Sequence, residues 1–240
     1  MKKLTTAGRS EPNNHMEGTN SKKLLRIDCV TSLFCLLPLV VGAAFYAQMP
    51  DRIPVHFGLD NRPDRYAGKT FALFGIPLLL LLLQLLCCGL SRLDKRGIET
   101  TPKMQILVRS IIPALSLTVE IIMVAVSLGN NPDVGKIILL LLGALFLLIG
   151  NYLPKCRQNR FLGIKLPTTL SSEENWNRTH RIAGRLWVVG GVAFLVAAFL
   201  PPIGRLILTL VTLVIMVVIP VAYSILLYRR ESAAPDNAAR

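Results

Sequence analysis

Six apolar runs, each close to the length needed to cross a lipid bilayer, constrain the fold of this chain more than any other feature. A helix rises 1.5 Å per residue, so about 20 apolar residues span a hydrocarbon core of roughly 30 Å. Because 52% of the 240 residues are hydrophobic, we expect an all-α, polytopic membrane protein with about six transmembrane helices. The predicted spans are residues 29–47, 70–90, 106–128, 135–153, 183–200 and 205–228.

The distribution of Lys and Arg predicts how the chain is oriented. Most of the 27 basic residues lie in the two tails and in the second and fourth connections, and positively charged segments stay on the cytoplasmic side. We therefore expect a multi-pass cell-membrane protein with cytoplasmic N and C termini. It would comprise a polar cytoplasmic tail (1–26), a six-helix membrane domain (27–228) with an outer loop (49–69) and an inner loop (154–182), and a second cytoplasmic tail (229–240).

Net charge and cysteine usage narrow the range of partners. Anionic lipid headgroups are a sufficient partner for the net charge of +13, and no direct nucleic-acid binding is expected. The five cysteines have neither the environment of a structural disulfide nor the spacing of a zinc site. Phosphate-binding glycine loops and nucleophile motifs do not occur in the sequence. We therefore predict no cofactor, no metal site and no catalytic residue.

The outer loop is expected to form a small ordered lid over the outer membrane surface. Its prolines resist helix formation, and Gly58 with the following polar residues favours a turn. Ile53, Val55 and Phe57 alternate as one face of a short strand. Under one interpretation this loop only caps two helices at the interface; under the other it contacts an external ligand. The candidate contact residues are Pro50, Pro54, His56, Phe57 and Asp60.

The inner loop and the residues before it are dense in side chains and backbone types with special chemistry. Glycine and proline fix the backbone, while Asn, Thr, His and Trp supply directed hydrogen bonds and anchors. The run Ser171–Glu174 resembles a helix start, so Trp176, Thr179 and His180 would share one face of a helix lying along the membrane before the fifth span. Structural anchoring and partner docking both remain open. The candidate residues are Asn151, Pro154, Asn159, Gly163, Pro167, Trp176, Thr179 and His180.

Glu120 is the conspicuous polar residue within the predicted spans. A carboxylate is costly in lipid and normally faces the bundle interior or water, which makes it a candidate functional group. It would be a proton-relay group, a ligand contact, or an acid hydrogen-bonded to a neighbouring helix, and the last interpretation is favoured. Gln84 in the second span is one candidate partner, although it lies nearer the inner surface.

Two motifs carry a resemblance to a known family. The first is Pro50-x-x-Ile53-Pro54-x-His56-Phe57, and the second runs from Gly150-Asn151-Tyr152-Leu153-Pro154 to Trp176-x-x-Thr179-His180-x-x-x-Gly184. Together they resemble the SdpI family of bacterial integral membrane immunity proteins. The family's usual Gly-Ile-Arg is here Gly163-Ile164-Lys165, which keeps the charge but loses the planar arginine fork.

The resemblance implies immunity. The family's namesake protects a producing bacterium from its own secreted killing factor, and it also signals by holding a cognate repressor at the membrane. By this analogy the outer loop would meet a peptide or protein toxin, and the inner loop would meet a cytoplasmic repressor. Two alternatives remain: a small membrane transporter that uses Glu120, and a membrane enzyme that uses His56 or His180 for acid–base chemistry. The enzyme ranks last, so we expect that the protein is not an enzyme.

Overall fold

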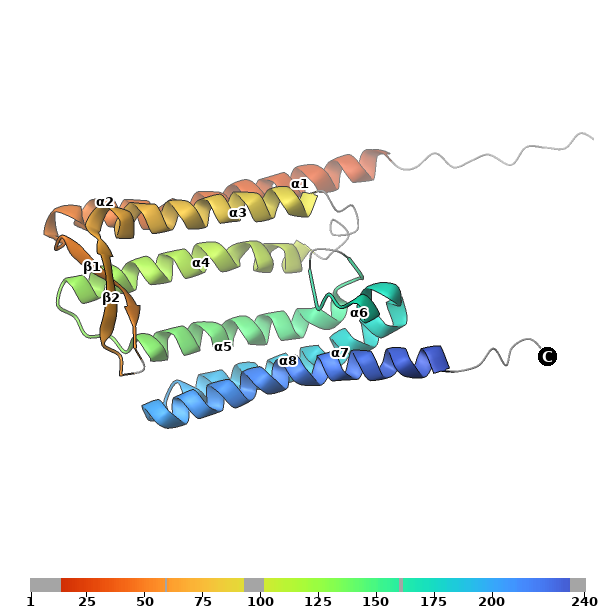
Figure 1. The fold of residues 1–240 in the computed structure, drawn as a ribbon. Helices are drawn as coiled ribbons and strands as arrows, with labels where there is room; N and C mark the ends of the chain where they lie inside the picture. The colour runs from red at the N-terminus through yellow and green to blue at the C-terminus, as the bar shows by residue number, and fades with distance from the viewer. Residues whose placement is uncertain (1–13, 59, 93–101, 160–161, 234–240) are drawn as a thin grey trace, which may run out of the picture.

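The computed structural model describes residues 14–58, 60–92, 102–159 and 162–233. In this part of the chain six helices are long and apolar enough to cross a membrane, which confirms the expected fold class. The candidate spans are Lys22–Gln48, Phe71–Arg92, Lys103–Ser127, Val134–Lys155, Glu173–Ala197 and Pro202–Ser232. They run side by side, with a small hairpin across one end (Figure 1).

The elements follow the apolar runs and the prolines that interrupt them. The helices are α1 (Asn14–Phe34), α2 (Leu37–Phe45), α3 (Ile76–Arg92), α4 (Pro102–Ser127), α5 (Val134–Tyr152), α6 (Pro167–Ser171), α7 (Glu173–Ala197) and α8 (Pro202–Ala233). Short helices η1 (Tyr46–Gln48), η2 (Phe71–Gly75, a π-helix) and η4 (Leu153–Lys155) and strands β1 (Arg52–Phe57) and β2 (Pro63–Gly68) complete the described structure. The first span is divided between α1 and α2, where Pro38 occupies the first turn of α2.

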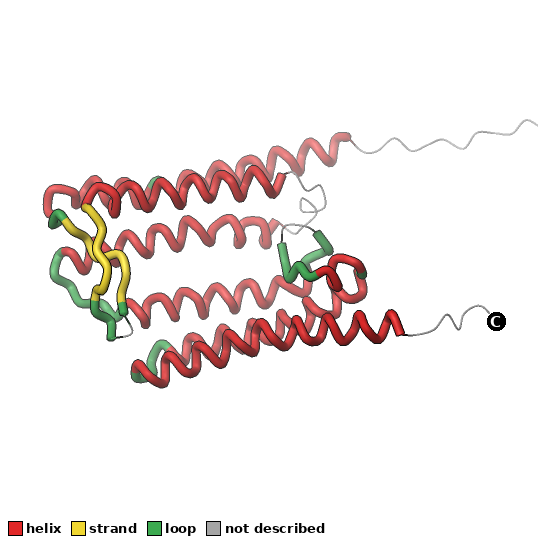
Figure 2. The backbone as a smooth tube through the Cα atoms, viewed as in Figure 1, coloured by secondary structure: helices red, strands yellow, loops and turns green. Residues whose placement is uncertain are grey.

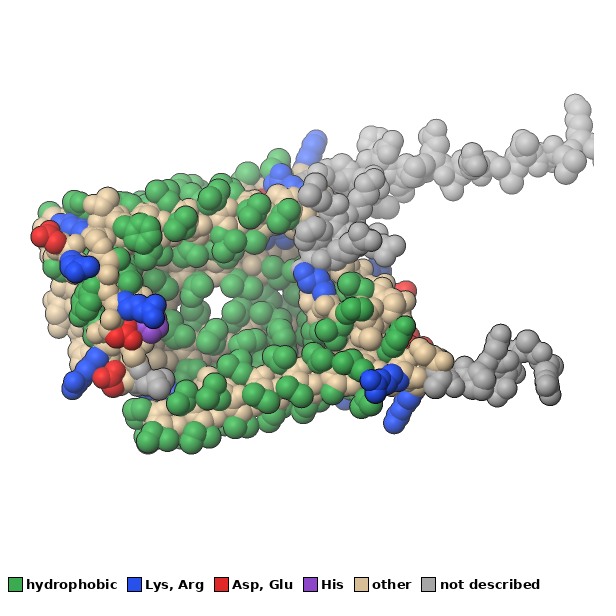
Figure 3. Space-filling model, in the orientation of Figure 1, with side chains coloured by type: hydrophobic (Ala, Val, Ile, Leu, Met, Phe, Trp, Pro, Cys, Tyr) green, Lys and Arg blue, Asp and Glu red, His purple; other side chains and the backbone are tan. Residues whose placement is uncertain are grey.

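The helices form two packed sets. Helices α1, α2 and α3 all contact α4, whereas α5 packs on α7 and α7 packs on α8. Figure 2 shows the two sets lying beside one another, with loops closing both ends. The space-filling view shows an opening between the sets that is bordered largely by hydrophobic side chains (Figure 3).

Glycines allow the close packing of α5 on α7. A Cβ atom built on Gly143 would lie 2.9 Å from the Gly191 carbonyl oxygen, and one built on Gly150 would lie 2.8 Å from the Gly184 carbonyl oxygen. The two antiparallel backbones therefore approach too closely for any larger side chain at these positions. The sequence contains no Gly-x-x-x-Gly signal in these spans, because the facing glycines are seven residues apart on each helix, at 143 and 150 on α5 and at 184 and 191 on α7.

The hairpin confirms the expected strand in the outer loop. Strand β1 pairs antiparallel with β2, and the turn contains Asn61 with a positive φ of 61°. Ile53 is fully buried and belongs to a cluster that includes Leu73 of η2 and Met123 of α4. This buried face fixes the hairpin to the helices beneath it.

The two ends of the bundle differ in character. We call the end that carries β1 and β2 the hairpin end. We call the opposite end, where α1 begins and α3 and α8 end, the basic end, because Arg92, Lys103, Lys155 and Arg229 lie there.

Two stretches depart from their expected conformation. Residues 14–26, expected as part of a polar tail, are already helical in α1, and residues 173–182, expected in the inner loop, form the first turns of α7. The prediction of a separate helix along the membrane is therefore wrong, because α7 runs unbroken to Ala197. Its start is nevertheless the predicted one, since Ser172 caps the helix by accepting the Asn175 amide. Residues 1–13 and 234–240 lie outside the described residues.

Candidate functional site

The outer face of the hairpin presents charged and polar side chains to the surroundings. His56 Nδ1 lies 2.6 Å from Asp64 Oδ1, and these side chains are 56% and 50% exposed. Asp60 is also exposed, and its Oδ1 accepts the Arg62 amide at 3.2 Å. Within the described residues no group of three or more His, Cys, Asp or Glu side chains is placed to hold a metal ion.

The remaining outer-loop candidates occupy different environments. Pro50 is exposed, Phe57 is half-buried, and Pro54 is buried beside Ile53 in β1. A buried proline cannot contact an external ligand without rearrangement. Pro54 therefore contributes to the packing of the hairpin, while the exposed candidates remain available for contact.

Asn61 joins the hairpin to the second set of helices. Its Nδ2 donates to the Pro132 carbonyl at 2.9 Å, and its Oδ1 accepts the Val134 amide at 2.8 Å. The neighbouring Asp133 accepts two hydrogen bonds from Arg205 of α8, at 2.7 and 2.8 Å. The Arg205 guanidinium, and after it the Lys136 backbone amide, lower the pKa of Asp133 from its ordinary value.

These contacts border a polar cavity of about 560 Å³ at the hairpin end. Its lining combines the ion pair with apolar residues at the turn between α7 and α8. The lining residues are Asp60, Asn61, Asn131, Asp133, Phe199, Leu200, Pro201, Pro202 and Arg205.

The predicted inner-loop motif folds into a buried core at the basic end. Trp176 and His180 stack with ring centroids 3.9 Å apart, and Trp176 Nε1 donates to the Cys156 carbonyl at 2.8 Å. His180 Nε2 accepts the Ile164 amide at 3.0 Å, so Nδ1 carries the proton and donates to the Trp176 carbonyl. Both nitrogens are occupied. His180 therefore fixes the loop backbone and is not free for acid–base chemistry in this conformation.

Gly163 occupies the tightest position in this motif. Its φ is +110°, and a Cβ atom there would collide with His180 Nε2 and with the Trp176 ring. Only glycine accommodates both the left-handed backbone and the stacked rings without strain. The shared helical face predicted for Trp176, Thr179 and His180 is confirmed, since all three side chains are at most 1% exposed.

Further hydrogen bonds connect the motif to α8. Thr179 Oγ1 donates to Asn175 Oδ1 at 3.1 Å, and Asn175 Nδ2 donates to the Ser224 carbonyl at 2.9 Å. Asn159 is buried, and its Oδ1 accepts the Leu162 amide at 2.6 Å. Asn175 and Ser224 are not among the predicted site residues, because nothing in the local pattern shows that residues 49 positions apart meet.

The three other inner-loop candidates lie at element boundaries. Asn151 is exposed near the end of α5, and Pro167 begins α6. Pro154 lies in η4 against α7, where a Cβ atom on Gly184 would approach its ring to 2.6 Å. Nearby, burial raises the pKa of the Cys156 thiol. This thiol is correspondingly a weak nucleophile.

Glu120 is fully buried in α4, and neither of its carboxyl oxygens has a hydrogen-bond partner among the described residues. The carboxyl group points at the backbone of Gly42, where a Cβ atom would lie 2.9 Å from Glu120 Oε1. Ser116, one turn earlier, is also buried without a partner in the described structure. The favoured interpretation of Glu120 as a hydrogen-bonded acid is therefore wrong for this conformation.

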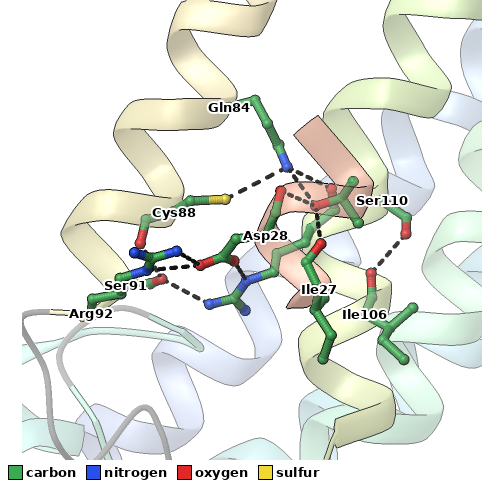
Figure 4. Close-up of polar contacts among 10 residues, drawn as sticks. Ile27, Asp28, Gln84, Cys88, Ser91, Arg92, Ile106 and Ser110 are labelled. Atoms are coloured by element: carbon green, nitrogen blue, oxygen red, sulfur yellow. Dashed lines mark hydrogen bonds and ion pairs between the residues drawn. The ribbon is translucent and has the colours of Figure 1, made fainter. Parts of the chain in front are cut away.

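Gln84 does not pair with Glu120. Its Nε2 donates to Thr31 Oγ1 at 3.2 Å and to the Arg109 carbonyl at 3.0 Å, near the basic end (Figure 4). The side chain is 1% exposed. Gln84 thus connects α1, α3 and α4 as part of a separate polar network.

That network contains an ion cluster that is not among the predicted sites. Asp28 is 3% exposed and accepts hydrogen bonds from Arg92 Nε and Nη2, at 2.8 and 2.6 Å, and from Arg109 Nε. Arg109 Nη2 also donates to Ser91 Oγ at 2.9 Å (Figure 4). One feature of the sequence could have predicted this cluster. An acidic residue and two arginines lie at the same ends of three neighbouring spans, and lipid would not solvate their charges.

Both candidate regions lie in segments shared with known proteins. Residues 155–224 match the model of the SdpI/YfhL protein family. The resemblance to the SdpI/YfhL family is therefore confirmed. This SdpI-type segment contains the buried Trp176–His180 motif, all of α7 and α8 as far as Ser224. Residues 33–81, which contain the hairpin, match a domain of unknown function, DUF1648.

One relative is similar to this chain over most of its length. The immunity protein SdpI of Bacillus subtilis (strain 168) is 23% identical over 175 residues, which cover 73% of this chain and 83% of that protein. No solved structure matches. The chain is thus a multi-pass membrane protein related to an immunity protein.

Proposed function

We propose that this protein is a membrane immunity protein that protects the cell from a secreted killing factor. The observation that carries the proposal is the similarity to the immunity protein SdpI over 83% of that relative. The architecture supports it, because the chain combines a membrane bundle with an ordered structure at the end expected to face outward. Membrane lipids are its constant surroundings, and the killing factor is its proposed peptide or protein partner.

The hairpin is the proposed contact surface for the killing factor. Its inner face is held by buried Ile53 and by the two Asn61 hydrogen bonds, while its outer face exposes His56, Asp60 and Asp64. A surface fixed in this way loses little conformational entropy on binding. The paired His56 and Asp64 offer directed hydrogen bonds to a polar segment of the toxin.

A signalling role is a finer proposal within the same function. In it, a cytoplasmic repressor binds the basic end when the killing factor occupies the hairpin end. The side chains of Trp176, Thr179 and His180 are buried, so the repressor would contact neighbouring exposed groups such as Arg178 and Glu174, which form an ion pair. The buried motif would then set the shape of that surface.

Transport through a Glu120-dependent step is the second candidate function. One observation favours it: both carboxyl oxygens of Glu120 lack hydrogen-bond partners among the described residues, although the side chain is fully buried. Buried acids in membrane helices often mark proton or ion pathways. The adjacent π-helix η2 adds support, because such segments are frequent at functional sites.

Survival of a sensitive bacterial host tests these proposals. Cells that express the protein would be challenged with a killing factor of the SdpC type and, separately, with an unrelated membrane-active peptide. Immunity predicts selective protection from the killing factor, reduced by the double substitution His56→Ala and Asp64→Ala. The control is Glu231→Gln, which removes an exposed carboxylate at the basic end of α8 and is expected to keep protection.

The same assay separates immunity from transport. Under immunity, Glu120→Gln retains protection because the hairpin surface is intact. If Glu120→Gln abolished protection while the hairpin variants retained it, the transport proposal would replace the immunity proposal. Equal sensitivity of cells with and without the protein would remove direct immunity to that toxin.

A further inference from the structure

A groove between α3 and α4 near the basic end is built for an amphipathic ligand. It encloses about 340 Å³, and the inner-loop residue Leu162 closes one side. Most of the lining is apolar, and the polar residues belong to the ion cluster and its neighbours. The lining residues are Gln84, Cys87, Cys88, Leu90, Ser91, Val108, Arg109, Ile111, Ile112 and Leu162.

Among the described residues, the ion cluster beside this groove carries more positive than negative charge. Arg92 and Arg109 bring two guanidinium groups to the single carboxylate of Asp28. The Nη1 atoms of both arginines donate no hydrogen bond to any described residue, and the Arg92 side chain is 44% exposed. The cluster therefore retains donors and charge for one further anion, and Arg109 places them at the groove.

The position of the groove identifies the class of ligand. It lies within the candidate spans Phe71–Arg92 and Lys103–Ser127, so its apolar part is at the depth of lipid chains. Its charged end coincides with the last residue of α3, where a span meets the headgroup region. An occupant with an anionic head and an apolar chain satisfies both ends, and anionic phospholipid is the membrane component with that chemistry.

We propose that the protein binds one anionic phospholipid at this groove. The phosphate accepts hydrogen bonds from Arg92 and Arg109, and one acyl chain lies between α3 and α4 against Val108 and Ile112. Because Asp28 holds both guanidinium groups in place, the site is formed before the lipid arrives. The proposal goes beyond immunity and does not depend on it.

Native mass spectrometry of the full chain, with lipids exchanged from nanodiscs, tests the site. The probes are phosphatidylglycerol and the zwitterionic phosphatidylcholine. We expect one phosphatidylglycerol to be retained in preference to phosphatidylcholine. Arg92→Gln should weaken phosphatidylglycerol binding about tenfold, because it removes a charge-assisted contact. The matched control, Arg229→Gln, removes an exposed basic-end arginine away from the groove and should leave retention unchanged.

A second variant tests the acyl-chain half of the site. Ile112→Phe narrows the groove without changing charge, and it should lower phosphatidylglycerol retention while leaving the melting temperature in pure phosphatidylcholine nanodiscs near that of the wild type. Equal retention of the two lipids, or equal losses for Arg92→Gln and Arg229→Gln, would overturn the proposal in favour of diffuse surface attraction. Displacement of the bound lipid by inorganic phosphate at millimolar concentration would reduce the site to a phosphate site and also overturn it.

Discussion

Glu120 places a carboxyl group inside the helix bundle without a hydrogen-bond partner in the part of the chain that the structure describes. An isolated ionised carboxylate in apolar surroundings is costly by many kcal/mol, so the site favours a group without charge. We expect Glu120→Gln to change the free energy of unfolding by less than about 1 kcal/mol, because glutamine keeps the size and the polarity of the neutral acid. Urea unfolding in detergent micelles measures this. The charge-bearing Glu120→Lys should prevent stable folding, and a lysine variant as stable as wild type would contradict this account.

Asp133 makes the free energy of unfolding depend on pH, and the direction of this dependence follows from its pKa. The pKa of Asp133 in the folded protein is lowered by Arg205 and then by the Lys136 amide. Its contribution to stability is therefore fully present above the pKa of the unfolded chain, about 3.9, and is lost as the pH falls through the folded pKa. Asp133→Asn preserves the helix cap but removes the ion pair. We expect a loss of about 1 kcal/mol or less at pH 7, because Asp133 is 42% exposed and solvent screens the pair.

The melting temperature as a function of pH checks this expectation. The wild-type and Asp133→Asn curves should be separated at neutral pH and converge in the acid range. A constant separation down to pH 2 would mean that the carboxylate of Asp133 is not the responsible group.

At the scale of elements, the packing of α5 on α7 depends on glycines that face each other. Gly150→Val would force a side chain against the Gly184 carbonyl and the Val188 amide, 2.8 and 2.7 Å from the new Cβ. Overpacking of this kind typically costs 1–3 kcal/mol. We expect a comparable loss in the free energy of unfolding, measured by urea unfolding in micelles.

Gly89 of α3 provides the matched control. Its built Cβ atom would meet nothing within 4 Å, so Gly89→Val should be close to neutral. If both substitutions lowered the free energy of unfolding equally, the loss would come from replacing any glycine in a membrane helix. It would then not come from the contact between α5 and α7.

At the scale of the whole molecule, the orientation of the bundle is a prediction from charge alone. The hairpin should face outward and the basic end should face the cytoplasm. In a cysteine-free background, Arg62→Cys should react with a membrane-impermeant maleimide in intact cells, whereas Arg178→Cys should react only after permeabilisation. Both arginine side chains are more than half exposed, at 85% and 54%, so accessibility differs only by side of the membrane. The reverse labelling pattern would invert the assignment of outer and inner surfaces.

Whole-molecule shape also decides what each candidate residue can do. The inner-loop residues Trp176, Thr179 and His180 form a satisfied core and support the surface around them. His56, by contrast, is exposed on a hairpin that is tied to both sets of helices. The same residue types therefore serve packing at one end of the bundle and remain available for contact at the other.

The sequence alone determined the features that belong to single segments. Apolar length predicts each span because the cost of transfer into lipid depends on the segment itself, and the Ile53–Val55–Phe57 alternation predicts β1 for a similarly local reason. Ser172 and the acids after it predict the start of α7. Only the tertiary structure decided how segments meet. Arg92 and Arg109 are 64 and 81 residues from Asp28 in the sequence. The Gln84 side chain contacts residues beside this cluster and does not contact Glu120. Such pairings follow from the relative depth and rotation of packed helices, which no local pattern encodes.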